Sequence, residues 1–142
     1  MKEKIIKSAR SWIGTPFKHQ GRVKGLGTDC LGLIVGIAVE CDLKTISGNN
    51  LSEYDVTEYD LSIDYDKLSQ CLANNLELSH KIEPGCLAVL SFDSNPQHLA
   101  IISDYTQDSL GIIHADMQSK SVTEHFLDES YLSKIQKIYK LG

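Results

Sequence analysis

Residues 30–41 form a segment of helical length that is apolar on nearly every side. It begins at Cys30 and runs from Leu31 to Val39 with only two glycines among apolar residues. A helix without a polar face is stable only when neighbouring elements cover it all round. The sequence therefore predicts a central, buried helix from Cys30 to about Cys41, preceded by a glycine-rich loop over residues 17–29.

Cys30 is expected at the N-terminus of this helix, directly after Asp29. Unpaired backbone N–H groups and the positive end of the helix dipole favour a thiolate there, and such sites lower a cysteine pKa to about 3.5–7.5. The alternative is a small buried hydrophobe, which is the usual role of a free cysteine. For Cys41, Cys71 and Cys86 we expect that core role. The four cysteines have no Cys-x-x-Cys spacing, so a structural zinc site is not expected. A disulfide framework is not expected either, because a cytosolic chain of this size does not need cross-links. A mixed metal site of Cys30, His98 and His114 is an alternative, without a His-Glu-x-x-His or similar spacing to point to it.

Two histidines stand at the edges of β-prone runs in the C-terminal part of the chain. His98 opens one run and His114 lies in the next, so a hairpin would place both side chains on the face toward Cys30. His80 is expected in a loop and His125 on a strand surface. An amphipathic helix is also predicted over residues 5–13. The fold class is therefore α+β, with helices packed on an antiparallel meander of about five strands: 87–92, 98–104, 111–115, 121–126 and 135–140.

Five short motifs, in this order along the chain, carry a resemblance to a known family. The chain resembles the NlpC family of papain-like cell-wall endopeptidases, and most closely the branch found in phage tails and gene transfer agents. That family has Gly-Thr-Pro-Tyr, Asp-Cys-Ser-Gly, Pro-Gly-Asp-Leu, His-Val-Gly-Ile and Ile-His-Ala. The corresponding stretches here are Gly14-Thr15-Pro16-Phe17, Asp29-Cys30-Leu31-Gly32, Pro84-Gly85-Cys86-Leu87, His98-Leu99-Ala100-Ile101 and Ile113-His114-Ala115.

The resemblance implies a cysteine endopeptidase with a Cys-His-His triad. Cys30 would attack an amide carbonyl, His98 would pair with it and protonate the leaving amine, and His114 would orient His98. The implied substrate is the peptidoglycan stem peptide, cut between γ-D-glutamate and a diamino acid. Asp29 would hold the free amine of that peptide, and it could also cap the helix. No cofactor is implied.

Three positions depart from the family's motifs and concern the substrate subsites. Phe17 replaces a tyrosine, Leu31 replaces a serine, and Cys86 replaces an aspartate. Because Phe17 has no hydroxyl to donate, His19 or Gln20 is the candidate side-chain donor to the oxyanion, beside the backbone N–H of Cys30.

Residues 42–80 form an acidic insertion between the helix of Cys30 and the sheet. Eight acidic residues stand there against two lysines, whereas the whole chain has a formal net charge of −5. Within it, Leu68, Cys71, Leu72 and Leu76 suggest one amphipathic helix. A solvated surface is the simplest interpretation. A docking surface for a basic partner and a wall of the substrate groove are the alternatives.

Length and charge restrict the remaining classes. The 142 residues, 42% of them apolar, fit a single domain spanning 1–142. The net charge shows no basic footprint for nucleic acid. We expect neither a signal peptide nor a membrane span. Synthesis in the cytoplasm followed by incorporation into a phage-tail-like particle is the expected route to the wall. Two alternatives are a tail-assembly or structural protein with little activity, and a thiol amidase or acyltransferase on another amide or ester.

Overall fold

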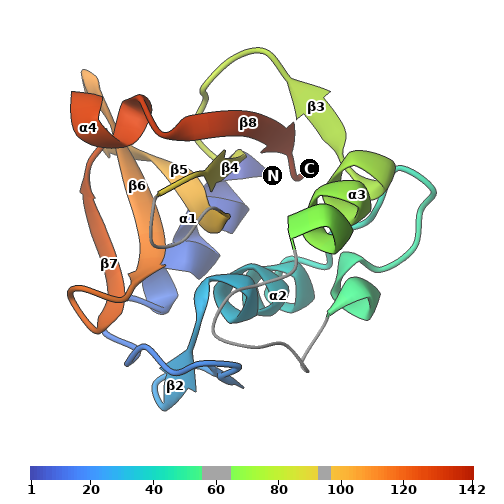
Figure 1. Ribbon diagram of the computed structural model, residues 1–142, viewed down its shortest axis with the longest axis horizontal. Coiled ribbons are helices and arrows are strands. Elements are labelled where there is room, and N and C mark those ends of the chain that lie inside the picture. The colour runs from blue at the N-terminus through green and yellow to red at the C-terminus, as the bar shows by residue number, and fades with distance from the viewer. Residues whose placement is uncertain (56–64, 93–96) are drawn as a thin grey trace.

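The computed structural model describes residues 1–55, 65–92 and 97–142, which form a layer of helices packed on an antiparallel sheet (Figure 1). Residues 56–64 of the acidic insertion and residues 93–96, which join the predicted strands 87–92 and 98–104, lie outside this description. The elements in chain order are α1 (Lys2–Ser11), β1 (Arg22–Val23), β2 (Gly27–Thr28), α2 (Cys30–Glu40), a 3₁₀ turn η1 (Leu51–Tyr54), α3 (Tyr65–Asn75), β3 (Glu77–Ser79), β4 (Leu87–Leu90), β5 (His98–Thr106), β6 (Ser109–Asp116), β7 (Ser121–Phe126), α4 (Glu129–Leu132) and β8 (Ile135–Lys140).

The predicted buried helix is α2, and it begins at Cys30. Its N-cap is Asp29, whose carboxylate accepts a hydrogen bond from the backbone N–H of Gly32. Leu33 and Ile37 are fully buried. Gly36 allows α1 to approach closely, because a Cβ at this position would lie 2.1 Å from the Trp12 ring. Most of the helix surface is thus covered, as the sequence predicted, although Val39 near its C-terminus is 63% exposed.

The large sheet has six strands in the order β3-β8-β4-β5-β6-β7, all antiparallel. From β4 to β7 the strands follow chain order, as predicted. The expectation that the last strand extends this meander was wrong, because β8 returns to pair with β4. All four residues of β4 are buried, and a strand buried on both faces needs a hydrogen-bonded neighbour at each edge. The short strand β3 and the β1–β2 hairpin were not predicted.

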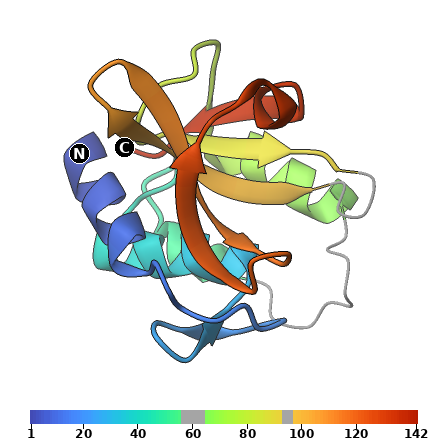
Figure 2. The same ribbon diagram turned by 90° about the vertical axis from the view of Figure 1, so that its left-hand side faces the viewer.

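Each face of the sheet covers its own apolar cluster. Along β5, Leu99 and Ile101 belong to the cluster beneath α1, α2 and α3, whereas Ala100 and Ile102 belong to the cluster on the opposite face. This alternation follows from the two-residue period of a strand. Figure 2, with β7 toward the viewer, shows the helix layer on one side of the sheet and α4 on the other. α4 was also not predicted.

The acidic insertion contributes to both layers. Leu68, Leu72 and Leu76 of the predicted amphipathic helix are buried in the helix-side cluster, and β3 joins the edge of the sheet beside β8. Asp55 is not a solvated surface charge, because it forms an ion pair with Arg22.

Cys41 and Cys86 are buried core residues as expected, and Cys71 is half-buried on α3. All four cysteines are unpaired thiols. Among the residues described, no helix combines the length and the apolar character needed to cross a bilayer.

Candidate active site

Cys30 meets the sheet at the start of β5, where β5 and β6 are not yet paired. The β5–β6 ladder begins at Ile101↔Ile113, whereas β5 pairs with β4 from His98 onward. The Ile102 N–H bonds toward the β4 side, to the carbonyl of Cys86. Since antiparallel bonds alternate along a strand, the N–H of Leu99 points to the β6 side. There it donates to the sulfur of Cys30. The thiol is thus bonded to the backbone of the residue that follows His98.

Three histidine rings form a hydrogen-bonded chain across β5, β6 and β7. Nε2 of His98 lies 2.7 Å from Nδ1 of His114, and Nε2 of His114 lies 2.8 Å from Nε2 of His125. Nδ1 of His125 lies 2.9 Å from the carbonyl oxygen of Phe126. His98 and His114 are buried. The predicted contact between these two histidines is therefore present, and a third histidine extends it. The expectation that both side chains face the helix of Cys30 was wrong. His98 and His114 alternate with residues of the helix-side cluster along β5 and β6, and His114 packs on Tyr131 of α4, on the opposite face of the sheet.

A cavity of about 310 Å³ opens over His98 and His114. This volume is at the lower end of the range for small-ligand sites. Its lining mixes aromatic, polar and acidic side chains: Phe92, His98, His114, Asp116, Met117, Gln118, Ser130 and Tyr131. Cys30 lies outside this lining and is only 5% exposed. His98 and His114 line the cavity although both are as buried as Cys30, at 6% and 1% exposed, so the thiol differs from them only in lying outside the lining.

The environment raises the pKa of Cys30 to about 11, contrary to the expected lowering. Removal from water is the main cause, and the negative charge of Asp29 adds to it. The N–H groups of Leu99 and Leu31 and the charge of Arg22 offset this only in part. A helix N-terminus contributes about 0.3–1 kcal/mol, which is less than the roughly 1.4 kcal/mol of a single pKa unit. Burial therefore outweighs the dipole.

Burial also lowers the pKa of His98 to about 4 and that of His114 to about 3. The neighbouring rings of His98 and His125 lower the pKa of His114 further, and the carboxylate of Asp116 acts in the opposite direction on both. In the resting state near neutral pH, Cys30 is thus a thiol and the rings of His98 and His114 are neutral. The expected thiolate–imidazolium pair is not the resting state.

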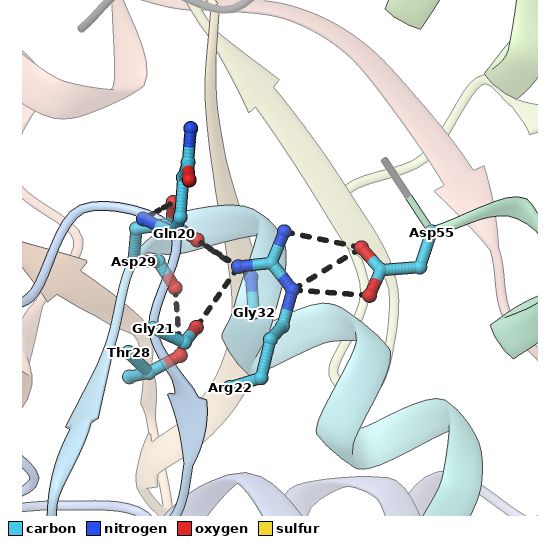
Figure 3. A network of polar contacts seen from close by, with 7 residues as sticks. All are labelled: Gln20, Gly21, Arg22, Thr28, Asp29, Gly32 and Asp55. Atoms are coloured by element: carbon cyan, nitrogen blue, oxygen red, sulfur yellow. Dashed lines mark hydrogen bonds and ion pairs between the residues drawn. The ribbon is translucent and has the colours of Figure 1, made fainter. Parts of the chain in front are cut away.

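Asp29 is the centre of a polar network at the N-terminus of α2 (Figure 3). One oxygen accepts from the Gly32 N–H at 2.8 Å and from Nη1 of Arg22 at 3.0 Å, and the other accepts from the Gln20 N–H at 2.9 Å. Arg22 also pairs with Asp55 at 3.1 Å. The capping role predicted for Asp29 is confirmed. A substrate amine would have to share this carboxylate with three protein donors.

The remaining predicted site residues lie near α2 and line no part of the cavity. Phe17 is partly buried against the helix-side cluster, and Leu31 is buried within it. Gln20 adopts a left-handed φ of 62°, and Figure 3 shows its side-chain amide extending away from the Asp29–Arg22 pair. His19 is half-buried in the same loop.

Sequence reasoning missed His125, Asp116 and Tyr131. His125 is half-buried and bonded to His114, which corrects its expected place on the strand surface. His125 pairs with Ile112 in the β6–β7 ladder, and Ile112 is two residues from His114 on the same strand, so both histidines lie on one face; the sequence alone does not give this register. Tyr131 packs against both rings, with centroids 5.6 Å from His114 and 4.7 Å from His125.

The helix layer, the antiparallel sheet and the cysteine at the start of a buried helix define a papain-like α+β fold. The NlpC/p60 domain of the peptidoglycan hydrolase SagA matches with a TM-score of 0.59 and 17% identity over 99% of each chain. Ly7917 matches with a TM-score of 0.60 and 13% identity over 99% of this chain. The structure of Ly7917 with the hydrolyzing product of MDP matches with a TM-score of 0.61 and 14% identity over 99% of this chain. This chain spans 62% of the length of Ly7917. Neither family models nor curated protein sequences give a match.

Proposed function

We propose that the protein is a cysteine peptidase that hydrolyses an amide bond in peptidoglycan stem peptides. The observation that supports the proposal is the position of Cys30 at the start of a buried helix, bonded to the backbone of the residue after His98, in a fold similar to the NlpC/p60 domain of a peptidoglycan hydrolase. The similarity to a structure holding the hydrolyzing product of MDP supports the same substrate class. The bond between γ-D-glutamate and a diamino acid is our choice within that class, and it rests on the sequence motifs.

In the proposed mechanism, the Cys30 sulfur attacks the amide carbonyl as its proton passes to His98. Because the thiol pKa is near 11, this transfer accompanies the attack and does not precede it. His98 then gives the proton to the departing amine, leaving a thioester on Cys30. Water, deprotonated by His98, cleaves the thioester and restores the thiol. His114 holds the ring of His98 through the 2.7 Å contact, and the Cys30 N–H meets the oxyanion.

Two parts of the substrate assignment rest on residues outside the cavity. Asp29 would bind the free amine of the stem peptide, in competition with Arg22. His19 or Gln20 would supply the second oxyanion donor. Delivery by a phage-tail-like particle is proposed on the sequence resemblance alone.

The test is incubation of the purified protein with defined stem peptides, followed by mass analysis of the products. Cys30→Ala and His98→Ala should abolish turnover, whereas His114→Ala should leave a reduced rate, because orientation contributes less than the nucleophile or the base. Cys71→Ala removes a half-buried thiol far from the site in sequence and is the matched control. Equal activity of Cys30→Ala and the unmodified protein would refute the assignment.

A second candidate is a structural protein of the same fold with little activity. It is favoured by the 5% exposure of Cys30 and by its position outside the cavity lining. Absence of cleavage by protein whose Cys30 reacts readily with an alkylating reagent would support this candidate over the peptidase.

A further inference from the structure

We propose that His125 is a positioning residue that sets the tautomer of His98 through His114, so that Nδ1 of His98 is the proton-accepting nitrogen. The hydrogen-bond assignment stands on the geometry alone. Its catalytic consequence rests on the proposed peptidase function.

The chain of rings is anchored at one end by a group that can only accept. The carbonyl oxygen of Phe126 lies 2.9 Å from Nδ1 of His125, so this nitrogen must carry a proton. In a neutral ring the other nitrogen, Nε2, is then an acceptor. The contact of 2.8 Å from that Nε2 to Nε2 of His114 requires the proton to lie on His114.

The same reasoning carries the polarity through to His98. A neutral His114 with its proton on Nε2 has a bare Nδ1, which accepts from Nε2 of His98 at 2.7 Å. His98 is thus protonated on Nε2, and its Nδ1 is an acceptor. The burial that lowers the pKa values of His98 and His114 supports the neutral form of both rings.

The rings are packed so that this order is retained. His98 and His114 meet edge to face with centroids 4.9 Å apart, and His114 and His125 do so at 5.0 Å. Tyr131 packs against the rings of His114 and His125 from α4. Rotation of either ring would therefore displace an aromatic neighbour.

The tautomer matters because only a bare nitrogen can take the proton of a thiol. The N–H of Leu99 holds the Cys30 sulfur next to the backbone of His98. If the chain ran in the opposite sense, Nδ1 of His98 would carry a proton and could not act as the base. The carbonyl of Phe126 on β7 thus decides which nitrogen of His98 on β5 accepts the proton of the thiol.

The test is the tautomeric state of His98 at pH 8, read from long-range ¹H–¹⁵N correlation spectra of the ¹⁵N-labelled full chain. In the unmodified protein we expect the proton on Nε2. His125→Gln offers an amide oxygen to His114 and should preserve that state. His125→Lys offers only donors, so it should reverse the chain and place the proton of His98 on Nδ1. Thr123→Val is the matched control, because Thr123 is the ladder partner of His114 and its hydroxyl has no hydrogen-bond partner among the described residues.

Stem-peptide kinetics provide the second measurement. We expect kcat to fall by roughly 10²-fold in His125→Lys with KM unchanged, since the loss is one of base catalysis, and to be largely rescued in His125→Gln. If His125→Lys does not fold, His125→Phe replaces it: without the anchor, His98 should no longer show a single tautomer.

Each outcome decides one proposal. A proton on Nδ1 of His98 in the unmodified protein overturns the positioning role, as does an unchanged tautomer in folded His125→Lys or His125→Phe. The expected tautomers without any cleavage of stem peptides support the histidine chain and count against the peptidase. Cleavage of stem peptides by protein whose His98 carries its proton on Nδ1 supports the peptidase and counts against the positioning role of His125.

Discussion

Lowering the pH from 7 to 5 should destabilise the fold through His98 and His114. Both are neutral in the folded protein, with pKa values lowered to about 4 and about 3 by burial, whereas a histidine in an unfolded chain has a pKa of about 6.5. Over this range the unfolded chain binds more protons than the folded one, so stability rises with pH. The contribution is fully present above pH 6.5 and is lost as the pH falls toward 4.

The size of the effect follows from these values. At pH 5 the unfolded chain gains about 2 kcal/mol per histidine relative to pH 7, and the folded protein gains almost nothing, so both together cost about 3–4 kcal/mol. For a chain of this length that corresponds to a fall in Tm of roughly 10–15 °C. The carboxylates of Asp116, Glu124 and Glu40 have lowered pKa values. Their contribution is lost only at lower pH, outside this window.

Urea unfolding at the two pH values measures the difference directly. The control is the double variant His98→Gln/His114→Gln, which removes both titrating rings and should show a much flatter pH dependence even though it is less stable at pH 7. A loss below about 1 kcal/mol in the unmodified protein would refute the reasoning. So would an equal loss in the double variant.

Three further predictions concern the helix of Cys30. Asp29→Ala should lower the free energy of unfolding by about 3 kcal/mol, because a buried carboxylate with three donors is removed. The control is Asp128→Ala, which removes the cap of the short exposed α4 and should cost about 1 kcal/mol. Equal losses of the two variants in urea unfolding would contradict the prediction. Gly36→Ala should destabilise by about 1–3 kcal/mol, since its Cβ would lie 2.1 Å from Trp12, and a gain in Tm would contradict the close helix crossing. Alkylation of Cys30 by iodoacetamide should increase with pH through the alkaline range, because its pKa is near 11; a rate already at its plateau near pH 7, followed by mass analysis, would indicate a thiolate.

Several features were predictable because they depend on neighbours along the chain. The buried helix from Cys30, its cap at Asp29 and the alternation of faces along β5 follow from residue periodicity and from local hydrogen bonding. The contact between His98 and His114 followed from the hairpin that joins their strands.

Other features depended on which distant segments become neighbours. That β8 returns to β4 is decided by the burial of β4 on both faces, and that the Cys30 thiol is protonated is decided by how much water the fold removes. The role of His125 required the register of β7 on β6 and the carbonyl that faces its ring.

The sequence by itself therefore determined the longer helices and strands and the contact between two histidines, because periods of 3.6 and 2 residues are local properties. The elements it did not predict, β1, β2, β3 and α4, are too short to show such a period. Only the tertiary structure decided the protonation of Cys30 and the polarity of the histidine chain. Desolvation and hydrogen-bond direction depend on every group packed around a side chain, wherever that group lies in the sequence.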